Sequence, residues 1–399
     1  MTSFIEVLGL YPDPKAWSPL VHELTGQAQV LVGGARLLGH FPGHAGQRVE
    51  LRAPLSQAMA AIAQARGQGL NVVVLADGDP LYFGIGRMLL EHFPPTDLRF
   101  YPGVTAVALA AARLKRPWQD LAVVSLHGRE DFAPLLAALA HRGAVAVYTG
   151  PGGTPGDIAR VLVEQGLEEA RLWVFEDMAG EGENLRQLSA AQAVGQRFAA
   201  LNLVLAEVPE PSRLLPGLSD EAMPSGLYTK WPVRACSLAS LRLHARARLW
   251  DVGAGSGAVA IEASARLPQG SVWAVERHPG RVQAMRENIR AAKAWQVRVV
   301  CGQAPQALAG LPQPDRIFLG GGLDQGLLPE LCARLAPGGR LVANVVLLSS
   351  LNQCLEHFRN LGWPVEVAQV QASVAKPLAG DLRLTAQNPV FILAADKPA

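Results

Sequence analysis

The first half of the chain alternates between short apolar runs and amphipathic segments. The apolar runs are rich in valine, leucine and isoleucine and have the length of strands, while Ser18-Pro19, Ser56 and Thr154-Pro155 are typical helix starts. Proline is tolerated there because the first turn of a helix leaves its N–H groups unpaired in any case. The pattern predicts an α/β domain over residues 1–208. Its predicted strands are Ile5–Leu10, Val30–Val32, Val72–Leu75, Leu121–Leu126, Val145–Tyr148, Leu172–Phe175 and Leu203–Ala206.

A second α/β domain is predicted over residues 221–399, organised around the segment 249–279. In that segment an apolar strand ending at Val252 runs into a glycine turn, an amphipathic stretch over Val259–Leu267, and a strand that ends at Glu276. Residues 209–220 concentrate proline and polar side chains between two regular patterns, which indicates a linker. The other predicted strands are Arg298–Val300, Arg316–Leu319, Arg340–Leu347, Val365–Gln371 and Val390–Ala394.

The segment 249–279 also predicts a nucleoside-binding site. Its glycines leave the backbone bare at the turn, where a Cβ would hold a ligand away, and Glu276 ends the next strand, where a carboxylate accepts ribose hydroxyls. Three glycines at every second position from Gly253, led by Asp251, resemble motif I of the class I S-adenosylmethionine-dependent methyltransferases. Ala258 also satisfies the last position of the dinucleotide fingerprint. Methyl transfer is therefore the leading interpretation, and hydride transfer with a nicotinamide cofactor is the alternative.

Composition narrows the classes of partner. The chain has 399 residues, of which 49% are hydrophobic and 18% charged, which is a globular composition with room for two or three domains. The formal net charge of +2 provides no whole-molecule field that would attract nucleic acid or an acidic membrane. We therefore expect neither as a partner.

Cysteine usage and the chain start indicate a compartment. Cys236, Cys301, Cys332 and Cys354 are scattered without a C-x-x-C pair, so we expect neither a metal site nor a disulfide frame. The first residues lack the basic and apolar regions of a signal peptide, and no apolar run reaches the roughly eighteen residues of a membrane span. These features predict a cytoplasmic protein.

Motifs on both sides of the glycine turn follow in a fixed order through the second half. Thr229-Lys230 lies upstream, and Gly302–Pro305, Gly320–Gly322, Pro337–Gly339 and Asn388–Val390 lie downstream. In this order they resemble the decarboxylating corrin methyltransferase domain of cobalamin biosynthesis, over roughly residues 213–396, with a Rossmann-like class I fold. The resemblance implies S-adenosylmethionine contacts at Thr229, Gly253, Ala254, Gly255, Ser256, Gly257, Glu276 and Ala304.

Two positions of this half depart from the family pattern. Gln303 stands where the family usually has aspartate, although its side-chain carbonyl still accepts from an adenine amine. Trp231-Pro232 stands where a glutamate is common. The Gly320–Gly322 loop has two interpretations of equal weight, an acceptor site or a tight strand-to-helix connection.

The first half contains a second set of motifs. A strand runs into Asp77-Gly78-Asp79-Pro80, and the segment 101–106 opens a helix. This set resembles the tetrapyrrole methylase family, whose fold consists of two α/β subdomains. Tyr11 and Asp13 depart from the glycines of its N-terminal loop. The resemblance implies S-adenosylmethionine contacts at Pro12, Asp77, Gly78, Asp79, Tyr82, Thr105 and Ala106.

Both resemblances in one chain, in this order, indicate the fused methyltransferase–decarboxylase family of corrin biosynthesis. The family implies methylation of precorrin-6B at C5 and C15, decarboxylation of the C12 acetate to give precorrin-8, and assembly as a homo-oligomer. A polycarboxylate tetrapyrrole substrate requires cationic groups to hold its carboxylates. We predict that Lys230 or Arg234 orients it, since both lie close to Thr229. Further candidate residues are Arg277, Arg383, Arg113, Lys115, Arg116, His127 and Arg129.

Other interpretations stay open. The chain is alternatively a class I methyltransferase for RNA or protein with the first half as a recognition module, although the near-neutral charge and the lack of Asn-Pro-Pro-Tyr after the strand before Gly320 count against it. The departures at Tyr11 and Asp13 suit a third interpretation, in which the first half is a degenerate scaffold. His127 is more typical of a hydrogen-bonded loop residue, so we assign it no chemistry.

Overall fold

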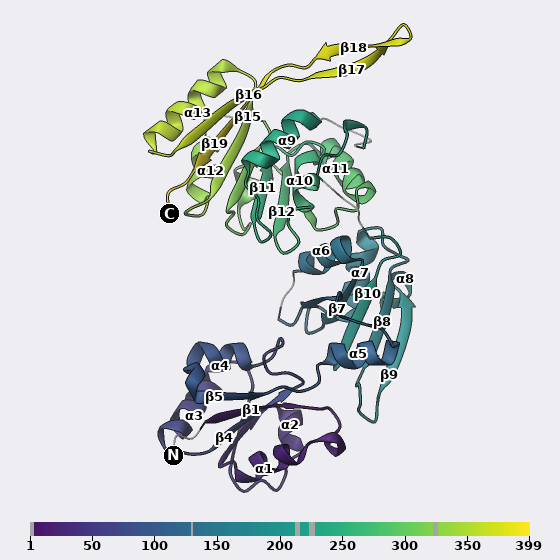
Figure 1. The fold of residues 1–399 in the computed structure, drawn as a ribbon, viewed down its shortest axis with the longest axis vertical. Helices are drawn as coiled ribbons and strands as arrows, with labels where there is room; N and C mark the ends of the chain where they lie inside the picture. Colours follow the sequence, from purple (N-terminus) through teal and green to yellow (C-terminus); the bar gives the residue numbers. More distant parts are fainter. Residues whose placement is uncertain (1–3, 129–130, 212–215, 223–227, 322–325) are drawn as a thin grey trace.

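The computed structural model describes residues 4–128, 131–211, 216–222, 228–321 and 326–399. Figure 1 shows three α/β units, each built on its own sheet and arranged in chain order along the long axis of the molecule. None of the helices within these ranges combines the length and the apolar character required to cross a bilayer.

The first unit is a five-stranded sheet in the order β3-β2-β4-β1-β5, in which all neighbouring strands are parallel. Its central strands are almost wholly buried because helices cover both faces. Parallel pairing brings the carboxyl ends of β1 and β4 to the same edge, with Leu10 opposite Asp77. The elements are β1 (Ile5–Leu10), α1 (Pro19–Gln27), β2 (Val30–Gly33), α2 (Ala35–Gly39), β3 (Gln47–Glu50), α3 (Ser56–Gly67), β4 (Val72–Asp77), α4 (Gly86–His92) and β5 (Leu98–Tyr101).

The second unit is a mixed sheet in the order β6-β7-β10-β8-β9, in which only β6 and β7 are parallel. The chain enters it through α5, whose N-cap residue Thr105 accepts from Ala108 N at 3.1 Å. At Thr154 both hydrogen bonds of a capping box are present, which confirms the predicted helix start. The elements are α5 (Ala106–Leu114), β6 (Ala122–Ser125), α6 (Ala133–Arg142), β7 (Ala144–Tyr148), α7 (Pro155–Glu164), β8 (Arg171–Glu176), β9 (Asn184–Ser189), α8 (Ala190–Ala193) and β10 (Asn202–Glu207).

The third unit is a seven-stranded sheet in the order β13-β12-β11-β14-β15-β19-β16. Strands β11 to β15 are parallel, β19 is antiparallel to both of its neighbours, and the strand order reverses between β11 and β14. Ligands of such sheets bind outside the carboxyl ends at this reversal. The elements are α9 (Trp231–Ser240), β11 (Arg248–Val252), α10 (Ala258–Ser264), β12 (Ser271–Glu276), α11 (Pro279–Ala291), β13 (Val297–Cys301), β14 (Arg316–Leu319), α12 (Leu327–Arg334), β15 (Arg340–Val345), α13 (Leu348–Asn360), β16 (Val365–Val370) and β19 (Val390–Asp396).

A hairpin of β17 (Ser373–Leu378) and β18 (Asp381–Ala386) extends away from this sheet (Figure 1). Its strands pair only with each other among the described elements, and three of its leucines are 51–73% exposed. The sequence did not predict it, because neither strand buries a face and Pro377 interrupts the first. The exposed leucines are Leu378, Leu382 and Leu384.

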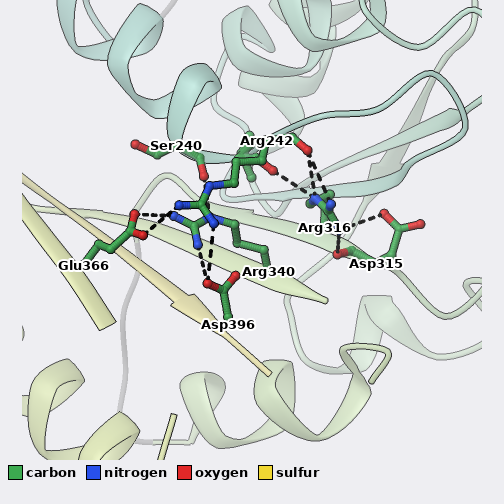
Figure 2. A network of polar contacts seen from close by, with 8 residues as sticks. Ser240, Arg242, Asp315, Arg316, Arg340, Glu366 and Asp396 are labelled. Atoms are coloured by element: carbon green, nitrogen blue, oxygen red, sulfur yellow. Dashed lines mark hydrogen bonds and ion pairs between the residues drawn. The ribbon is translucent and has the colours of Figure 1, made fainter. Parts of the chain in front are cut away.

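A cluster of arginine side chains and carboxylates connects several elements at the amino ends of the parallel strands of the third sheet, opposite their carboxyl ends (Figure 2). Arg340, the first residue of β15, is 2% exposed and donates from Nη1 to Asp396 and from Nη2 to Glu366, each at 2.6 Å. Its Nε donates to the carbonyl of Ser240 at the end of α9, at 2.5 Å. The cluster thus ties β15, β16, β19 and α9 at one point.

The second and third units share an interface. Trp295, between α11 and β13, is 3% exposed and belongs to the apolar cluster of the second unit, together with Leu139 and Leu162. Arg298 forms an ion pair with Asp131 across the same boundary. A side chain of the C-terminal unit therefore completes a core of the N-terminal half.

Candidate active sites

A pocket of about 800 Å³ opens at the carboxyl ends of β11, β12 and β14, and we call it the C-terminal pocket. Of the predicted residues it contains Thr229, Lys230, Gly253, Ala254, Gly255, Glu276 and Ala304. The predicted candidate Arg277 and the departure Gln303 line it as well.

The turn after β11 forms the floor of this pocket. The φ angles of Gly253, Gly255 and Gly257 are 73°, 59° and 85°, a region that favours glycine. A Cβ on Gly253 would lie 3.0 Å from the carbonyl oxygen of Gly321, and Gly320 N donates to Val252 O at 3.0 Å. Gly320 and Gly321, the first residues after β14, therefore pack closely against the turn and line the pocket. Gly322 lies outside the described residues, and both interpretations of the Gly320–Gly322 loop stay open.

Two of the predicted cofactor contacts lie behind the pocket wall. Ser256 is completely buried, and the side-chain amide of Asn288 donates to its carbonyl at 2.9 Å. A Cβ on Gly257 would lie 2.6 Å from Cγ of Met285 on α11. Ser256 and Gly257 thus hold the turn against α11 instead of facing the pocket, which corrects the expectation for these positions.

Glu276 ends β12 and faces the pocket with a fixed carboxylate. Its side chain is 4% exposed, Oε2 accepts from Gly255 N at 3.0 Å, and Oε1 accepts from His278 N at 3.0 Å. A carboxylate has about four acceptor positions, so each oxygen keeps capacity for a hydroxyl of a ligand. The geometry suits recognition of vicinal hydroxyls.

Asp251 lies directly beneath the turn. It is 1% exposed, and Oδ2 accepts from Ala260 N at 3.0 Å, while Oδ1 is buried without a hydrogen-bond partner among the described residues. Burial raises the pKa of Asp251 to about 7, opposed by the Ala260 N–H and reinforced by the charge of Glu276. Its charge therefore changes near neutral pH.

The rim of the C-terminal pocket combines cations with apolar side chains. Lys230 is exposed and its Nζ lies 4.2 Å from the ring centroid of Tyr228. Arg277, which follows the carboxyl end of β12, and Arg281 on α11 line the pocket as well. Val346, which lines the pocket, begins a run of three exposed apolar residues with Leu347 and Leu348, at 61–66% exposure. The rim therefore offers both positive charge and a bare apolar surface.

Arg234 does not reach this pocket. It is completely buried on α9, and its guanidinium donates to the carboxylates of Glu262 and Asp220 and to two backbone carbonyls. A side chain with no exposed surface does not contact substrate, so the prediction that Arg234 orients substrate is wrong for this structure. Lys230 remains the candidate.

A second cavity of about 410 Å³, the N-terminal pocket, lies between the first and second units. Three backbone segments approach closely beneath it: a Cβ on Gly9 would lie 2.2 Å from Gly78 O and 2.4 Å from Gly103 N. Only glycine fits at that position, because both obstructing atoms belong to the backbone. The cavity contains all seven predicted residues, namely Pro12, Asp77, Gly78, Asp79, Tyr82, Thr105 and Ala106.

Polar contacts fix the wall of the N-terminal pocket. Asp77 forms an ion pair with Arg36, and Asp79 Oδ1 accepts from Leu81 N at 2.9 Å. Tyr148 lies across from Tyr82, with ring centroids 6.4 Å apart. Burial, and secondarily the nearby Tyr82, raises the pKa of Tyr148 to about 12, so its hydroxyl is a neutral donor at neutral pH.

Sequence reasoning missed several lining residues of both pockets. These residues come from strands, loops or, for Arg36, helix α2, far from the motifs: they are Arg36, Tyr148 and Met178 of the N-terminal pocket and Asn344 and Val346 of the C-terminal pocket. No local signal marks them, because only the sheet topology brings them to the sites. Alternating apolar residues in the sequence identify such strands, but they do not show which residues of the strand face a pocket.

The other predicted cations lie elsewhere. Arg113 pairs with Glu183, with Nη2 and Oε2 2.9 Å apart, and Arg116 pairs with Glu207 at 3.3 Å. Arg383 lies on the projecting hairpin, and neither His127 nor Lys115 lines the two pockets described above. Arg129 lies outside the described residues.

Two nucleoside-type pockets, one in each half, define a class of protein: a tandem of two S-adenosylmethionine-dependent methyltransferase folds. Family models agree, with "Tetrapyrrole (Corrin/Porphyrin) Methylases" matching residues 13–194 and "Precorrin methyltransferase domain" matching residues 223–397. The chain is 35% identical over 390 residues to the precorrin-6Y C(5,15)-methyltransferase (decarboxylating) of Sinorhizobium sp., covering 95% of this chain and 93% of the relative. It therefore belongs to the precorrin-6Y C(5,15)-methyltransferase (decarboxylating) family.

Two relatives from Salmonella typhimurium each match less than half of the chain. The cobalt-precorrin-6B C(15)-methyltransferase (decarboxylating) is 36% identical over 172 residues, which is 42% of this chain and 88% of the relative. The cobalt-precorrin-7 C(5)-methyltransferase is 34% identical over 185 residues, which is 46% of this chain and 90% of the relative. Family membership confirms the predicted family and fold class, and it implies S-adenosylmethionine as methyl donor.

Proposed function

We propose that the chain methylates precorrin-6B at C5 and C15 and removes the C12 acetate carboxyl group as carbon dioxide, giving precorrin-8. The first half carries the C5 methylation, and the second half carries the C15 methylation and the decarboxylation. The observation that supports this most is the presence of two separate pockets, each lined by the residues expected of its own methyltransferase family.

Both pockets fit S-adenosylmethionine. Their volumes lie within the roughly 300–1,000 Å³ of small-molecule sites, and glycines leave room at the backbone where a Cβ would protrude. In the C-terminal pocket Glu276 accepts the ribose hydroxyls, and Gln303 and Ala304 lie where the adenine edge would be read. S-adenosylmethionine, when bound, supplies an electrophilic methyl group on its sulfonium.

The rim of the C-terminal pocket suits a large polycarboxylate tetrapyrrole. Lys230, Arg277 and Arg281 hold peripheral carboxylates, and the apolar run 346–348 receives the ring face. Methyl transfer to an electron-rich carbon depends chiefly on alignment and exclusion of water. In decarboxylation the electrons of the broken C–C bond enter the conjugated ring, and the ring takes up a proton. The carboxylate loses its charge in this step, so the protein must leave the reacting carboxylate poorly solvated.

The proposal extends to assembly and compartment. The projecting hairpin exposes Leu378, Leu382 and Leu384 on an edge with free backbone groups, which suits pairing with a second copy in a homo-oligomer. Sedimentation of the Leu382→Asp, Leu384→Asp double variant tests this proposal. We expect it to yield a smaller species than the unaltered chain.

The compartment is proposed from the cysteines. Cys236 and Cys301 are free and exposed, which suits a reducing cytoplasm.

Mass spectrometry of the product tests the proposed reaction. The full chain with precorrin-6B and S-adenosylmethionine should add two methyl groups and lose one carbon dioxide. Asp79→Ala should prevent only the C5 methylation, whereas Glu276→Ala should suppress the C15 methylation together with the decarboxylation. A product unchanged in mass, although S-adenosylmethionine binds, would refute the proposed substrate.

A further inference from the structure

A buried ion cluster lies behind the C-terminal pocket. Arg234 and Glu262 are 0% and 1% exposed, and Arg234 Nε lies 2.5 Å from Glu262 Oε1. Asp220 joins the pair, with Oδ1 3.2 Å from Arg234 Nη1. Charges taken out of water are costly unless each is paired and hydrogen-bonded, and here the carboxylates receive further donors. Gly217 N donates to Glu262 Oε2 at 2.8 Å, and Trp231 N donates to Asp220 Oδ1 at 2.9 Å.

The cluster joins three separate segments. Arg234 Nη2 donates to Leu218 O and Nη1 donates to Thr229 O, each at 2.5 Å. Leu218 belongs to the segment predicted as a linker, Thr229 lies in the pocket wall, and Glu262 lies on α10, which begins at the glycine turn. One guanidinium therefore fixes the end of the linker and the Thr229–Lys230 wall relative to the helix that carries the turn.

We propose that Arg234 is a positioning residue for the C-terminal reaction, acting through Thr229 and Lys230 on the geometry of the C-terminal pocket. An apolar side chain of the same volume would fill the space of Arg234, and replacing both members of a buried ion pair by apolar side chains is often neutral for stability. Such an apolar side chain has no hydrogen-bond donors, whereas the rigid fork of arginine donates in three directions. On this view the last linker residues, 217–220, are part of the second active site.

The inference rests on the proposed function only for its kinetic readout. The C15 methylation and the release of carbon dioxide report on the C-terminal half alone. Calorimetric titration of S-adenosylmethionine tests the pocket without any reaction. Absence of all turnover would therefore count against the proposed function. The titration would still show whether Arg234 affects the affinity of the pocket for S-adenosylmethionine.

The test compares Arg234→Met with Arg340→Met. Arg340 is an equally buried arginine of the same unit with a similar set of donors, but its cluster lies at the other end of the strands (Figure 2). Both variants should lower Tm. Only Arg234→Met should raise KM for S-adenosylmethionine in the C15 methylation, by about tenfold or more, because small misplacements of a pocket wall have large effects.

A conservative variant separates positioning from stability. Arg234→Lys keeps a charge beside Glu262 but lacks the donors that reach Leu218 and Thr229 together, so we expect Tm near that of the unaltered chain with KM still raised. Glu262→Gln gives a further folded variant if Arg234→Met fails to fold. Unchanged KM and unchanged S-adenosylmethionine affinity in Arg234→Lys and Glu262→Gln would overturn the inference.

Discussion

Two carboxylates beside the glycine turn of the C-terminal unit have different surroundings. Glu276 has a backbone N–H on each oxygen and faces the pocket, whereas Asp251 has one N–H and an oxygen buried without a partner. Hydrogen bonds to the charged form favour ionisation, and burial without them opposes it. Glu276 therefore suits recognition of a ligand, and Asp251 supports the turn.

At Glu276 the prediction concerns affinity. Glu276→Gln keeps the shape but replaces one acceptor oxygen by an amide donor. KM for S-adenosylmethionine in the C15 methylation should therefore rise about tenfold or more, since a hydrogen bond to a charged group contributes about 1.5–3 kcal/mol. Glu287→Gln on the exposed face of α11 is the matched control and should leave KM unchanged. Equal KM values for both variants would exclude a role for the carboxylate.

At Asp251 the prediction concerns pH. Its folded-state pKa of about 7 lies above the ordinary aspartate value of 3.8, so between these values the folded state binds more protons than the unfolded state. Stability from this group is therefore complete at low pH and is lost as pH rises toward about 7. In urea unfolding, Asp251→Asn should gain stability relative to the unaltered chain between about pH 5 and pH 8. A constant difference across that range would contradict the shifted pKa.

At the scale of elements, the strand ends of the first sheet form a close-packed floor. Gly9→Ala should abolish C5 methylation while carbon dioxide release persists, because its Cβ would meet Gly78 O and Gly103 N, which belong to two neighbouring segments. Gly26→Ala on α1 is the control, since a Cβ there meets nothing within 4 Å and alanine favours a helix. Full C5 methylation by Gly9→Ala would show that the floor is adaptable.

Most strands that the sequence predicted have a buried face, although the predicted β16 is largely exposed. Strand Val72–Asp77 is apolar up to its last residue and was predicted nearly to its end, because helices cover both faces of the sheet. Strands β3 and β9 are mostly polar and lie at sheet edges, so no hydrophobic pattern marks them. The prediction for β15 ran on to Leu347 because the exposed apolar rim of the pocket continues the apolar run.

The same distinction applies to the sites. Glycine turns and strand-end acids are local in sequence, and the structure places them in the two pockets. Burial of a cation is not local: Arg234 follows Lys230 by four residues, but one helical turn carries it from the pocket rim to the core. Its partner Glu262 is 28 residues further along, so no spacing rule indicates the pair.

At the scale of the molecule, the two halves are joined by more than a linker. Trp295 of the C-terminal unit fills part of the core formed by the second sheet and its helices. The ion pairs Arg298–Asp131 and Lys293–Glu210 flank it, the latter with Nζ and Oε2 2.9 Å apart. Salt bridges at exposed positions contribute little, so the buried indole carries most of the coupling.

Removal of that indole should therefore loosen both halves. Trp295→Ala should cost about 3–5 kcal/mol, as large-to-small changes in a core do, and hydrogen exchange should accelerate in α6 and α7 as well as in α11. Phe358→Ala on α13 removes an equally buried ring from within the C-terminal unit, so its effect should stop at that unit. If Trp295→Ala also left α6 and α7 unchanged, the two halves would be mechanically independent, and the fusion would serve only to keep two active sites on one chain.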